Sequence, residues 1–296
     1  MNKPQLKHIA ELAYRTLFRQ APDLCEIQET FYGWVVFLAS EKGRVVVKFS
    51  REIGRLRKEV EGLGRLREAV PCKVPEVLFF GREQGYSYLV LEWVDGVSAH
   101  QLPTNKEAIQ TFSHSYIDIL LSLHDVSSPE GFENDHGEFE PHFTDAFEQW
   151  MAPVYRYVMS DGSPFSPELK ESYLQLWEMK NRILTSMSPQ SSLVHDDCHL
   201  GNVLFDPKTY QVSAILDPCD VGFKHREMDL FHLYDVRPEL NLVEKYTQQH
   251  PIDDEFTVRR WFFSLWDDAK HSRNMGWYDE AWLQDKVDKF NRCYYQ

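Results

Sequence analysis

The hydrophobic pattern of the chain changes near Gly96, and this change limits the possible folds more than any other feature of the sequence. Before Gly96, five strand-like runs are bounded by turn residues, and an amphipathic helical window follows the third run. After it, six long windows have helical spacing: 105–124, 143–159, 167–186, 238–249, 254–274 and 279–293. The sequence therefore predicts an α+β fold, with a small antiparallel-sheet lobe over residues 1–94 and a larger helical lobe over residues 95–296.

Within the first lobe, the clearest local signal is a β-hairpin. Two β-rich runs are separated by the short segment Glu41-Lys42-Gly43, and a glycine there predicts a turn with Gly43 at positive φ. The elements with defined bounds are helices over 5–20 and 56–70 and four of the five strand-like runs, over 31–40, 44–50, 74–81 and 86–94.

The composition excludes several classes of protein. With 43% hydrophobic and 26% charged residues, the chain has the balance of a globular protein and not of a disordered or collagen-like one. It has no apolar run long enough for a transmembrane helix, and its first residues lack the apolar region of a secretory signal. The five cysteines form no CxxC pair, so we expect a reducing, cytoplasmic location. They are Cys25, Cys72, Cys198, Cys219 and Cys293.

The charge of the chain is uneven. The net charge is −14, which argues against a general nucleic-acid binder or a binder of anionic membranes. Residues 1–96 carry 15 Lys/Arg against 13 Asp/Glu, whereas residues 97–296 carry 17 against 33. This difference indicates either an acidic solvated surface on the second lobe or a division of labour, in which the first lobe handles an anion and the second a cationic or polyhydroxy substrate. The sequence leaves the oligomeric state open.

The densest group of polar residues lies in segment 192–220. Two short apolar strands are predicted inside it, joined by a turn at 206–208. In an antiparallel pair the start of one strand lies beside the end of the next, so Asn202 and Asp217 are expected side by side. An amide oxygen beside a carboxylate suits Mg²⁺. Asp197 lies five residues before Asn202, on the loop that leads into this site.

An aspartate, an asparagine five residues later and then a metal-binding aspartate is the order of base and metal ligands in kinases. The segment His195–Asn202 resembles the H-G-D-x-H-x-x-N loop of the aminoglycoside phosphotransferase, choline kinase and fructosamine kinase superfamily, and Ile215–Asp217 resembles its metal motif. Asp217-Pro218 followed by 225–230 is most similar to the fructosamine kinase branch. The resemblance covers about residues 25–235.

The resemblance implies a bilobal protein-kinase-like fold with a short catalytic hairpin, and a kinase that uses ATP and Mg²⁺. Its acceptor would be a hydroxyl of a small molecule: a sugar, an amino sugar, a fructosamine-like compound or an amino alcohol. Asp197 would be the base, with Asn202 and Asp217 as metal ligands. The residues implied to support the loop without taking part in the chemistry are His195, His199 and Asp229.

The first lobe holds a candidate phosphate ligand. Lys48 lies in an apolar strand, and Glu59 lies on the apolar stripe of the following helix, where a carboxylate needs a partner. Lys48 is the natural candidate, and the family places such a pair at the nucleotide phosphates. The resemblance also implies that the backbone around Glu92 and Val94 binds adenine. The phosphate loop offers only Gly33, although such loops are usually glycine-rich.

The last sixty residues match the family only in being helical and aromatic. They contain four of the eight tryptophans, which we expect in the core, with an aromatic substrate wall as the second interpretation. These are Trp261, Trp266, Trp277 and Trp282. The acidic second lobe favours a cationic or sugar-amine acceptor.

Two other functions stay open from the sequence. In a metal-dependent hydrolase, a transition metal would be held by His195, Asp196, Asp197, His199 and Asp217. That function explains neither Lys48 nor Glu59. In a nucleotide-binding pseudokinase, the glycine-poor loop and Asp196, which stands where the family usually has glycine, would mark lost chemistry. Asp196 would either face solvent or add a second carboxylate beside the base.

Overall fold

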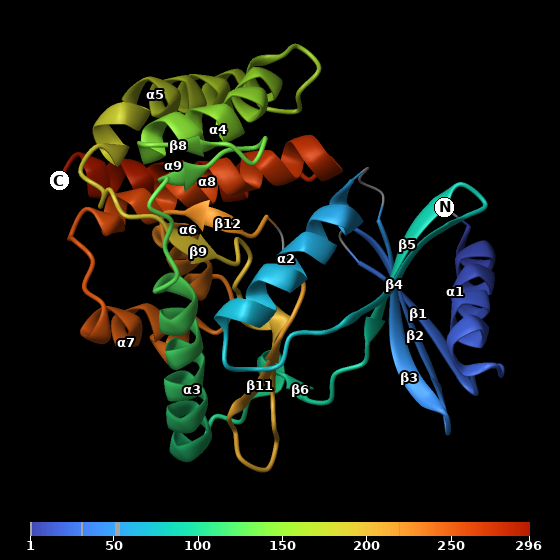
Figure 1. The fold of residues 1–296 in the computed structure, drawn as a ribbon. Coiled ribbons are helices and arrows are strands. Elements are labelled where there is room, and N and C mark those ends of the chain that lie inside the picture. The colour runs from blue at the N-terminus through green and yellow to red at the C-terminus, as the bar shows by residue number, and fades with distance from the viewer. Residues whose placement is uncertain (1, 31, 51–53, 219) are drawn as a thin grey trace.

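The computed structural model describes residues 2–30, 32–50, 54–218 and 220–296, so Cys219, considered above, lies outside it. Figure 1 shows a twisted sheet with one helix, α1 (Lys3–Phe18), on its outer face, and a larger group of helices on the other side of the molecule. The predicted α+β architecture is confirmed. The boundary between residues 94 and 95 stays a prediction.

The first lobe is a five-stranded antiparallel sheet with the order β1-β2-β3-β5-β4. Its strands are β1 (Leu24–Glu29), β2 (Gly33–Ser40), β3 (Gly43–Ser50), β4 (Val77–Glu83) and β5 (Tyr86–Glu92). Alternate residues of β2 and β3, such as Val36 and Val45, are fully buried in a cluster with α1. The helix α2 (Arg55–Ala69) follows the third strand, as predicted, and contacts β3, β5 and the second lobe. Glu59 of α2 therefore faces the sheet.

The β2–β3 hairpin is present, but the expected reason for its glycine is wrong. Ser40 pairs with Gly43 across a two-residue turn, and Gly43 does not have a positive φ. A Cβ atom on Gly43 would lie 2.3 Å from Cε1 of Phe18, the last residue of α1. Close contact with the Phe18 ring, and not backbone conformation, therefore favours glycine here.

Most of the second lobe is helical. Its long helices lie within two residues of their predicted bounds: α3 (Lys106–His124), α4 (Phe143–Met159), α5 (Pro167–Leu184), α8 (Phe256–Met275) and α9 (Glu280–Tyr294). The helix predicted over 238–249 is broken. A 3₁₀ turn over Pro238–Leu240 precedes α7 (Leu242–Gln249), because Asn241 between them has a φ of 50°, in the left-handed region.

The core of the second lobe is aromatic. Trp266 of α8 is fully buried among helices α4, α5 and α9, and its ring contacts those of Phe147, Tyr173 and Phe262. Within the described part of the chain, no helix is both long and apolar enough to cross a membrane.

Short strands carry the polar segment of the second lobe. They are β6 (Val97–Ser98), β7 (Phe132–Glu133), β8 (Phe139–Glu140), β9 (Ser192–Val194), β10 (Val203–Phe205), β11 (Val212–Ile215) and β12 (Gly222–Lys224). The predicted hairpin is β10–β11, while β9 pairs with β12. The strand β6, which pairs with β10, is not predicted by the sequence, because two residues show no periodicity. This pairing attaches the chain entering the second lobe directly to the hairpin.

Candidate active site

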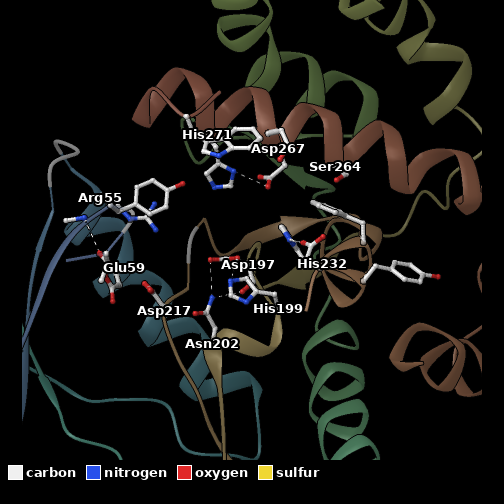
Figure 2. Close-up of a pocket in the computed structure, with 18 of the residues that line it drawn as sticks. Arg55, Glu59, Asp197, His199, Asn202, Asp217, His232, Ser264, Asp267 and His271 are labelled. Atoms are coloured by element: carbon white, nitrogen blue, oxygen red, sulfur yellow. Dashed lines mark hydrogen bonds and ion pairs between the residues drawn. The ribbon is translucent and has the colours of Figure 1, made fainter. Parts of the chain in front are cut away.

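Asn202 and Asp217 lie at the same end of the β10–β11 hairpin. Val203 pairs with Ile215, and the Leu216 N–H donates a 2.8 Å hydrogen bond to the Asn202 carbonyl oxygen. The two side chains therefore start from adjacent backbone, as the antiparallel pattern predicts. Figure 2 shows both of them beside Asp197.

A buried aspartate supports the loop that carries Asp197. Asp229 lies in the short helix α6 (Glu227–Leu230), and its carboxylate accepts 2.8 Å hydrogen bonds from the backbone N–H groups of His195 and Asp196. His124 Nε2 lies 3.1 Å from the same carboxylate. Burial raises the pKa of Asp229, but the hydrogen bond and charge of His124, together with His195, outweigh it, so the pKa lies below its usual value. The backbone just before Asp197 is thereby fixed.

The two histidines of the loop also have defined contacts. His195 Nε2 lies 3.0 Å from the Leu216 carbonyl oxygen, which joins the loop to the end of β11. His199 Nδ1 accepts a 2.9 Å hydrogen bond from the Gly201 N–H, and its Nε2 lies 3.3 Å from Asp197 Oδ1. Both rings are therefore placed to hold the shape of the loop.

Asp197 has an unusual ionisation. Burial raises its pKa to about 6, although the neighbouring His232 and His195 oppose the rise. The Asn202 side-chain amide donates to the Asp197 carbonyl oxygen at 2.9 Å and to its Oδ2 at 3.1 Å. A carboxylate with a pKa this close to neutrality can accept a proton and release it again, as a general base must.

Lys48 connects the two lobes. Its Nζ lies 2.6 Å from Oε1 of Glu59, the predicted partner, and 2.7 Å from Oδ1 of Asp217. Burial lowers the pKa of Lys48, but the two carboxylates outweigh it and raise the pKa above its ordinary value. Burial likewise raises the pKa of Asp217, and Lys48 lowers it below its ordinary value. The sheet, α2 and the hairpin thus share one ionic cluster, with Glu59 and Asp217 visible in Figure 2.

A cavity of about 600 Å³ lies between the lobes, and the sequence-predicted residues in it are Gly33, Lys48, Glu59, Asp197, His199, Asn202 and Asp217. Gly33 opens β2, next to the loop expected to bind phosphate. A Cβ atom there would lie 1.9 Å from the carbonyl oxygen of Phe49, so close packing of two strands already requires glycine.

The cavity does not include the two residues expected at the adenine. Glu92 ends β5, its N–H donates to the Glu76 carbonyl oxygen, and its carboxylate pairs with Lys73. Val94 follows on the segment that enters the second lobe. Neither is among the described residues that line the cavity, and their role stays a prediction.

Comparison with known proteins decides the family. A model of the phosphotransferase enzyme family matches residues 24–261. The chain belongs to this family. Two curated relatives are the uncharacterized protein YcbJ of Escherichia coli (strain K12), 23% identical over 65% of each chain, and a probable ketoamine kinase of Enterococcus faecium, 25% identical over 60% of this chain and 61% of the relative. The chain thus spans less than two thirds of the length of these relatives.

Solved structures show the same fold. A candidate fructosamine-3-kinase from Haemophilus somnus 129PT has a TM-score of 0.74 and 17% identity over 96% of each chain. An aminoglycoside phosphotransferase in ternary complex with AMP-PNP and hygromycin B has a TM-score of 0.73 and 17% identity over 96% of this chain and 98% of that one. A GDP complex of an aminoglycoside 2'-phosphotransferase has a TM-score of 0.68 and 16% identity over 98% of this chain and 97% of the other. The kinase-like fold and the phosphotransferase family are therefore both established.

The 195–202 loop has an aspartate in a strained position. Asp196 has a φ of 63°, in the left-handed region where glycine is favoured. Its side chain is buried, so it does not face solvent; its Oδ2 lies 3.2 Å from Lys224 Nζ and 3.5 Å from Lys270 Nζ of α8. Asp196 thereby connects the loop to β12 and α8 instead of to the cavity.

The ligand set of the alternative hydrolase is not assembled. His195 contacts the Leu216 carbonyl oxygen and Asp196 contacts two lysines, so their side chains do not share a point with that of Asp217. Among residues 2–30, 32–50, 54–218 and 220–296, no three His, Cys, Asp or Glu side chains are grouped to hold a metal ion. The match to the phosphotransferase family likewise gives no support to the hydrolase.

Two cavity residues in the first lobe, Arg55 and Tyr32, are not indicated by any sequence motif. Arg55 begins α2, and its guanidinium carbon lies 3.4 Å from the ring centroid of Tyr32, in the loop before β2. The Tyr32 ring lies 5.9 Å from that of His271 of α8, so residues of the two lobes meet at this end of the cavity. A single arginine in a charged helix gives no sequence signal of this kind.

The tryptophans divide between core and cavity. Trp266 is in the core, as expected, whereas Trp261, Trp277 and Trp282 line the cavity, where the aromatic wall was the second interpretation. One face of α8 also lines the cavity: Arg260, Ser264, Asp267, Asp268 and His271. Polar residues three or four apart, which fall on one face of a helix, are the pattern that could have revealed this face.

Proposed function

We propose that this phosphotransferase transfers the γ-phosphoryl group of ATP to a hydroxyl of a small molecule, with Mg²⁺ as cofactor. The acceptor is a sugar, an amino sugar, a fructosamine-like compound or an amino alcohol. The observation that carries the proposal is the convergence in one cavity of Lys48, Glu59, Asp197, Asn202 and Asp217. The AMP-PNP complex of a structural neighbour supports the choice of nucleotide.

The first lobe would bind the nucleotide. Lys48 is the proposed phosphate ligand, with Glu59 as its buried partner. Because Lys48 also contacts Asp217, phosphate oxygens would compete for the lysine and release the aspartate. Arg55 adds a second cation to the same cavity and offsets the shortage of glycine in the loop at Gly33. The adenine contact of the backbone at Glu92 and Val94 rests on the family resemblance alone.

Asn202 and Asp217 fit a magnesium ion by their chemistry, since carboxylate and amide oxygens are the ligands that Mg²⁺ takes from proteins. The Asn202 amide nitrogen donates to Asp197, so its oxygen is available for another contact. Bound Mg²⁺ would neutralise charge on the phosphates. His195, His199 and Asp229 would fix the loop that presents these ligands.

Asp197 is the proposed base. The acceptor oxygen forms a bond to the γ-phosphorus while the bond from phosphorus to the β–γ bridging oxygen breaks. The hydroxyl proton passes to the Asp197 carboxylate and later to solvent, which leaves ADP and a phosphate monoester. Since the pKa of Asp197 is about 6, most of its carboxylate is ionised and ready to accept a proton at neutral pH.

A thermal-shift titration tests the nucleotide site. ATP at a hundred times its dissociation constant stabilises a folded protein by about 2.7 kcal/mol. We expect a shift that grows with Mg²⁺ in the wild type and loses its Mg²⁺-dependent part in Asp217→Asn. Asp161→Asn, at an exposed position outside the cavity, is the matched control. GTP should be titrated in parallel, because one structural neighbour was solved with GDP. A wild type without any nucleotide shift contradicts the proposal.

The variant Asp197→Asn tests the chemical step. Loss of a general base lowers kcat by roughly 10²- to 10⁴-fold. The nucleotide shift should remain, because Asp197 contacts neither Lys48 nor Glu59. Phosphate transfer over a panel of sugars, ketoamines and amino alcohols provides the measurement. Turnover equal to that of the wild type would exclude Asp197 as the base.

A further inference from the structure

The two edge strands of the first-lobe sheet differ in what they present to solvent. β1 forms one edge, and its exposed side chains are two glutamates and a glutamine. β4 forms the other edge and exposes the large apolar side chains of Leu78, Phe79 and Phe80, at 40%, 45% and 40%. Polar side chains protect a sheet edge from pairing with another chain, whereas a hydrophobic edge favours such pairing. The β4 edge is therefore a candidate interaction surface.

A β-bulge explains why three residues in a row are exposed. Val77 pairs with Leu91 and Phe79 pairs with Val90, so Leu78 is an extra residue on β4. In a regular strand successive side chains point to opposite faces, and the bulge breaks this alternation. In the described part of the chain seven large apolar residues are exposed, and only the three on β4 are consecutive. The apolar surface of the first lobe is thus concentrated on one edge.

The backbone of β4 has hydrogen-bonding groups that a further strand could use. Among the described strands, β4 pairs with β5 alone. Glu83 and Tyr86 flank a two-residue turn, and residues in that position exchange both of their backbone hydrogen bonds. Because the pattern alternates along an antiparallel pair, the backbone groups of Phe80 and Arg82 point away from β5. An added strand would pair with these groups and cover the aromatic rings at the same time.

The charges at the two ends of this edge are opposite. Glu76 lies just before β4 and Arg82 near its end; both are exposed, and neither has an ion-pair partner among the described residues. If two β4 strands pair antiparallel about a two-fold axis near Phe79 and Phe80, each Glu76 comes close to Arg82 of the second copy. A parallel pair would bring like charges together. The edge is therefore complementary to itself in the antiparallel orientation.

The overall charge of the chain also favours contact through the first lobe. Residues 1–96 carry 15 Lys/Arg against 13 Asp/Glu and are close to neutral, whereas residues 97–296 are strongly acidic. Figure 1 shows the turn between β4 and β5 on the side of the molecule away from the helical lobe. Contact at this edge therefore avoids the repulsion that two acidic lobes would cause. None of the described residues that line the cavity falls within 76–83, so the contact would leave the cavity open.

We propose that two copies of this chain associate through antiparallel pairing of their β4 strands, which joins their sheets into one continuous sheet. The association is closed, because each copy uses its β4 edge and the β1 edges that remain are polar. It does not depend on the proposed function: a failed ATP shift would leave it standing, and a monomeric protein would leave the proposed function standing.

Charge reversal at the two ends of the edge tests the association. The variants are Glu76→Arg and Arg82→Glu, and the matched controls are Glu26→Arg, at an exposed position of β1, and Arg156→Glu, at an exposed position of α4. Sedimentation velocity over a range of concentrations gives the dissociation constant of each protein. Native mass spectrometry of an equimolar mixture separates homodimers from heterodimers, because the two variants differ in mass. Thermal unfolding shows whether each variant is folded.

We expect the wild type and both controls to form dimers with the same dissociation constant. Each variant alone places two pairs of like charges in the contact, which should raise the dissociation constant by about tenfold or more. Mixing Glu76→Arg with Arg82→Glu restores opposite charges at both ends, so the heterodimer should exceed both homodimers. A mixture without excess heterodimer, or variants that dimerise like the wild type, would overturn the proposal. A wild type that stays monomeric would also overturn it, and a strand of a different protein would then be the remaining occupant of this edge.

Hydrogen exchange tests the position of the contact. We expect the amides of Phe80 and Arg82 to exchange more slowly as the wild-type concentration rises, while those of β1 exchange at a constant rate. Phe80→Glu, which places a charge at the centre of the edge, should remove the concentration dependence. A dimer whose β4 amides show no such protection would pair through another surface and would contradict the proposal.

Discussion

Two charged clusters lie on either side of the 195–202 loop, and they differ in how completely their groups are satisfied. In the first cluster, Asp229 and His124 are buried, and the Asp229 carboxylate receives two backbone N–H groups and the histidine. In the second, Lys48 is shared between two carboxylates at the cavity, and Asp197 has a pKa of about 6. The first cluster fixes the backbone conformation of the loop, while the second has ion pairs that a charged ligand could exchange.

The two clusters differ in which of their groups could exchange an ion-pair partner for a ligand. A buried network with every group bonded is rigid, because breaking any contact leaves an unsatisfied polar atom. A lysine between two carboxylates can exchange one partner for a phosphate without leaving a buried charge alone. In the proposed function, the rigid side of the loop would position Asp197 and the adaptable side would bind phosphate.

The largest effect is expected from the rigid side. Asp229→Ala removes the acceptor of two backbone N–H groups and the partner of His124. Breaking a buried charged network of this kind costs about 3–5 kcal/mol. Chemical denaturation provides the measurement, with the exposed Asp161→Ala expected within about 0.5 kcal/mol of the wild type. Equal stability of Asp229→Ala and Asp161→Ala would show that the Asp229 cluster is not the rigid part of the site.

An intermediate effect is expected from pH on the adaptable side. Asp197 accepts a proton only when ionised, and burial raises its pKa to about 6. The rate of phosphate transfer should therefore be constant above this value and fall about tenfold for each pH unit below it. The measurement is the pH profile of kcat for the wild type and for the residual activity of Asp197→Asn. If the kcat of Asp197→Asn fell at low pH with the same midpoint as the wild type, the pKa would belong to another group.

The smallest effect concerns Asp196, which joins the loop to β12 and α8. Asp196→Gly and Asp196→Ala both remove the contacts with Lys224 and Lys270, but only glycine relieves the φ of 63°. Asp196→Gly should therefore be more stable than Asp196→Ala by about 1 kcal/mol. Denaturant unfolding of the two variants measures this difference. The reverse order would show that the backbone at 196 is not strained.

Much of the site was accessible to prediction because its signals are local. The proximity of Asp197, Asn202 and Asp217 follows from the spacing of the loop and the hairpin. The pairing of Lys48 with Glu59 follows because a buried carboxylate on a helix needs a cation, and the strand lysine supplies it. Arg55 and Arg260 could not be found in this way. Each lies beside an aromatic ring from a different part of the chain, and such contacts leave no periodicity in the sequence.

By itself, the sequence determined the α+β division, the bounds of the long helices and the hairpin that brings Asn202 to Asp217, because periodicity and turn chemistry act over a few residues. Only the tertiary structure decided that Asp196 turns to two lysines and that Trp266 is core while three other tryptophans line the cavity. It also decided that Arg259 is buried against Glu227 whereas Arg260 lines the cavity. Burial and partner choice depend on elements far apart in the chain. Two adjacent arginines look alike in a sequence, but they enter different environments once the helices pack.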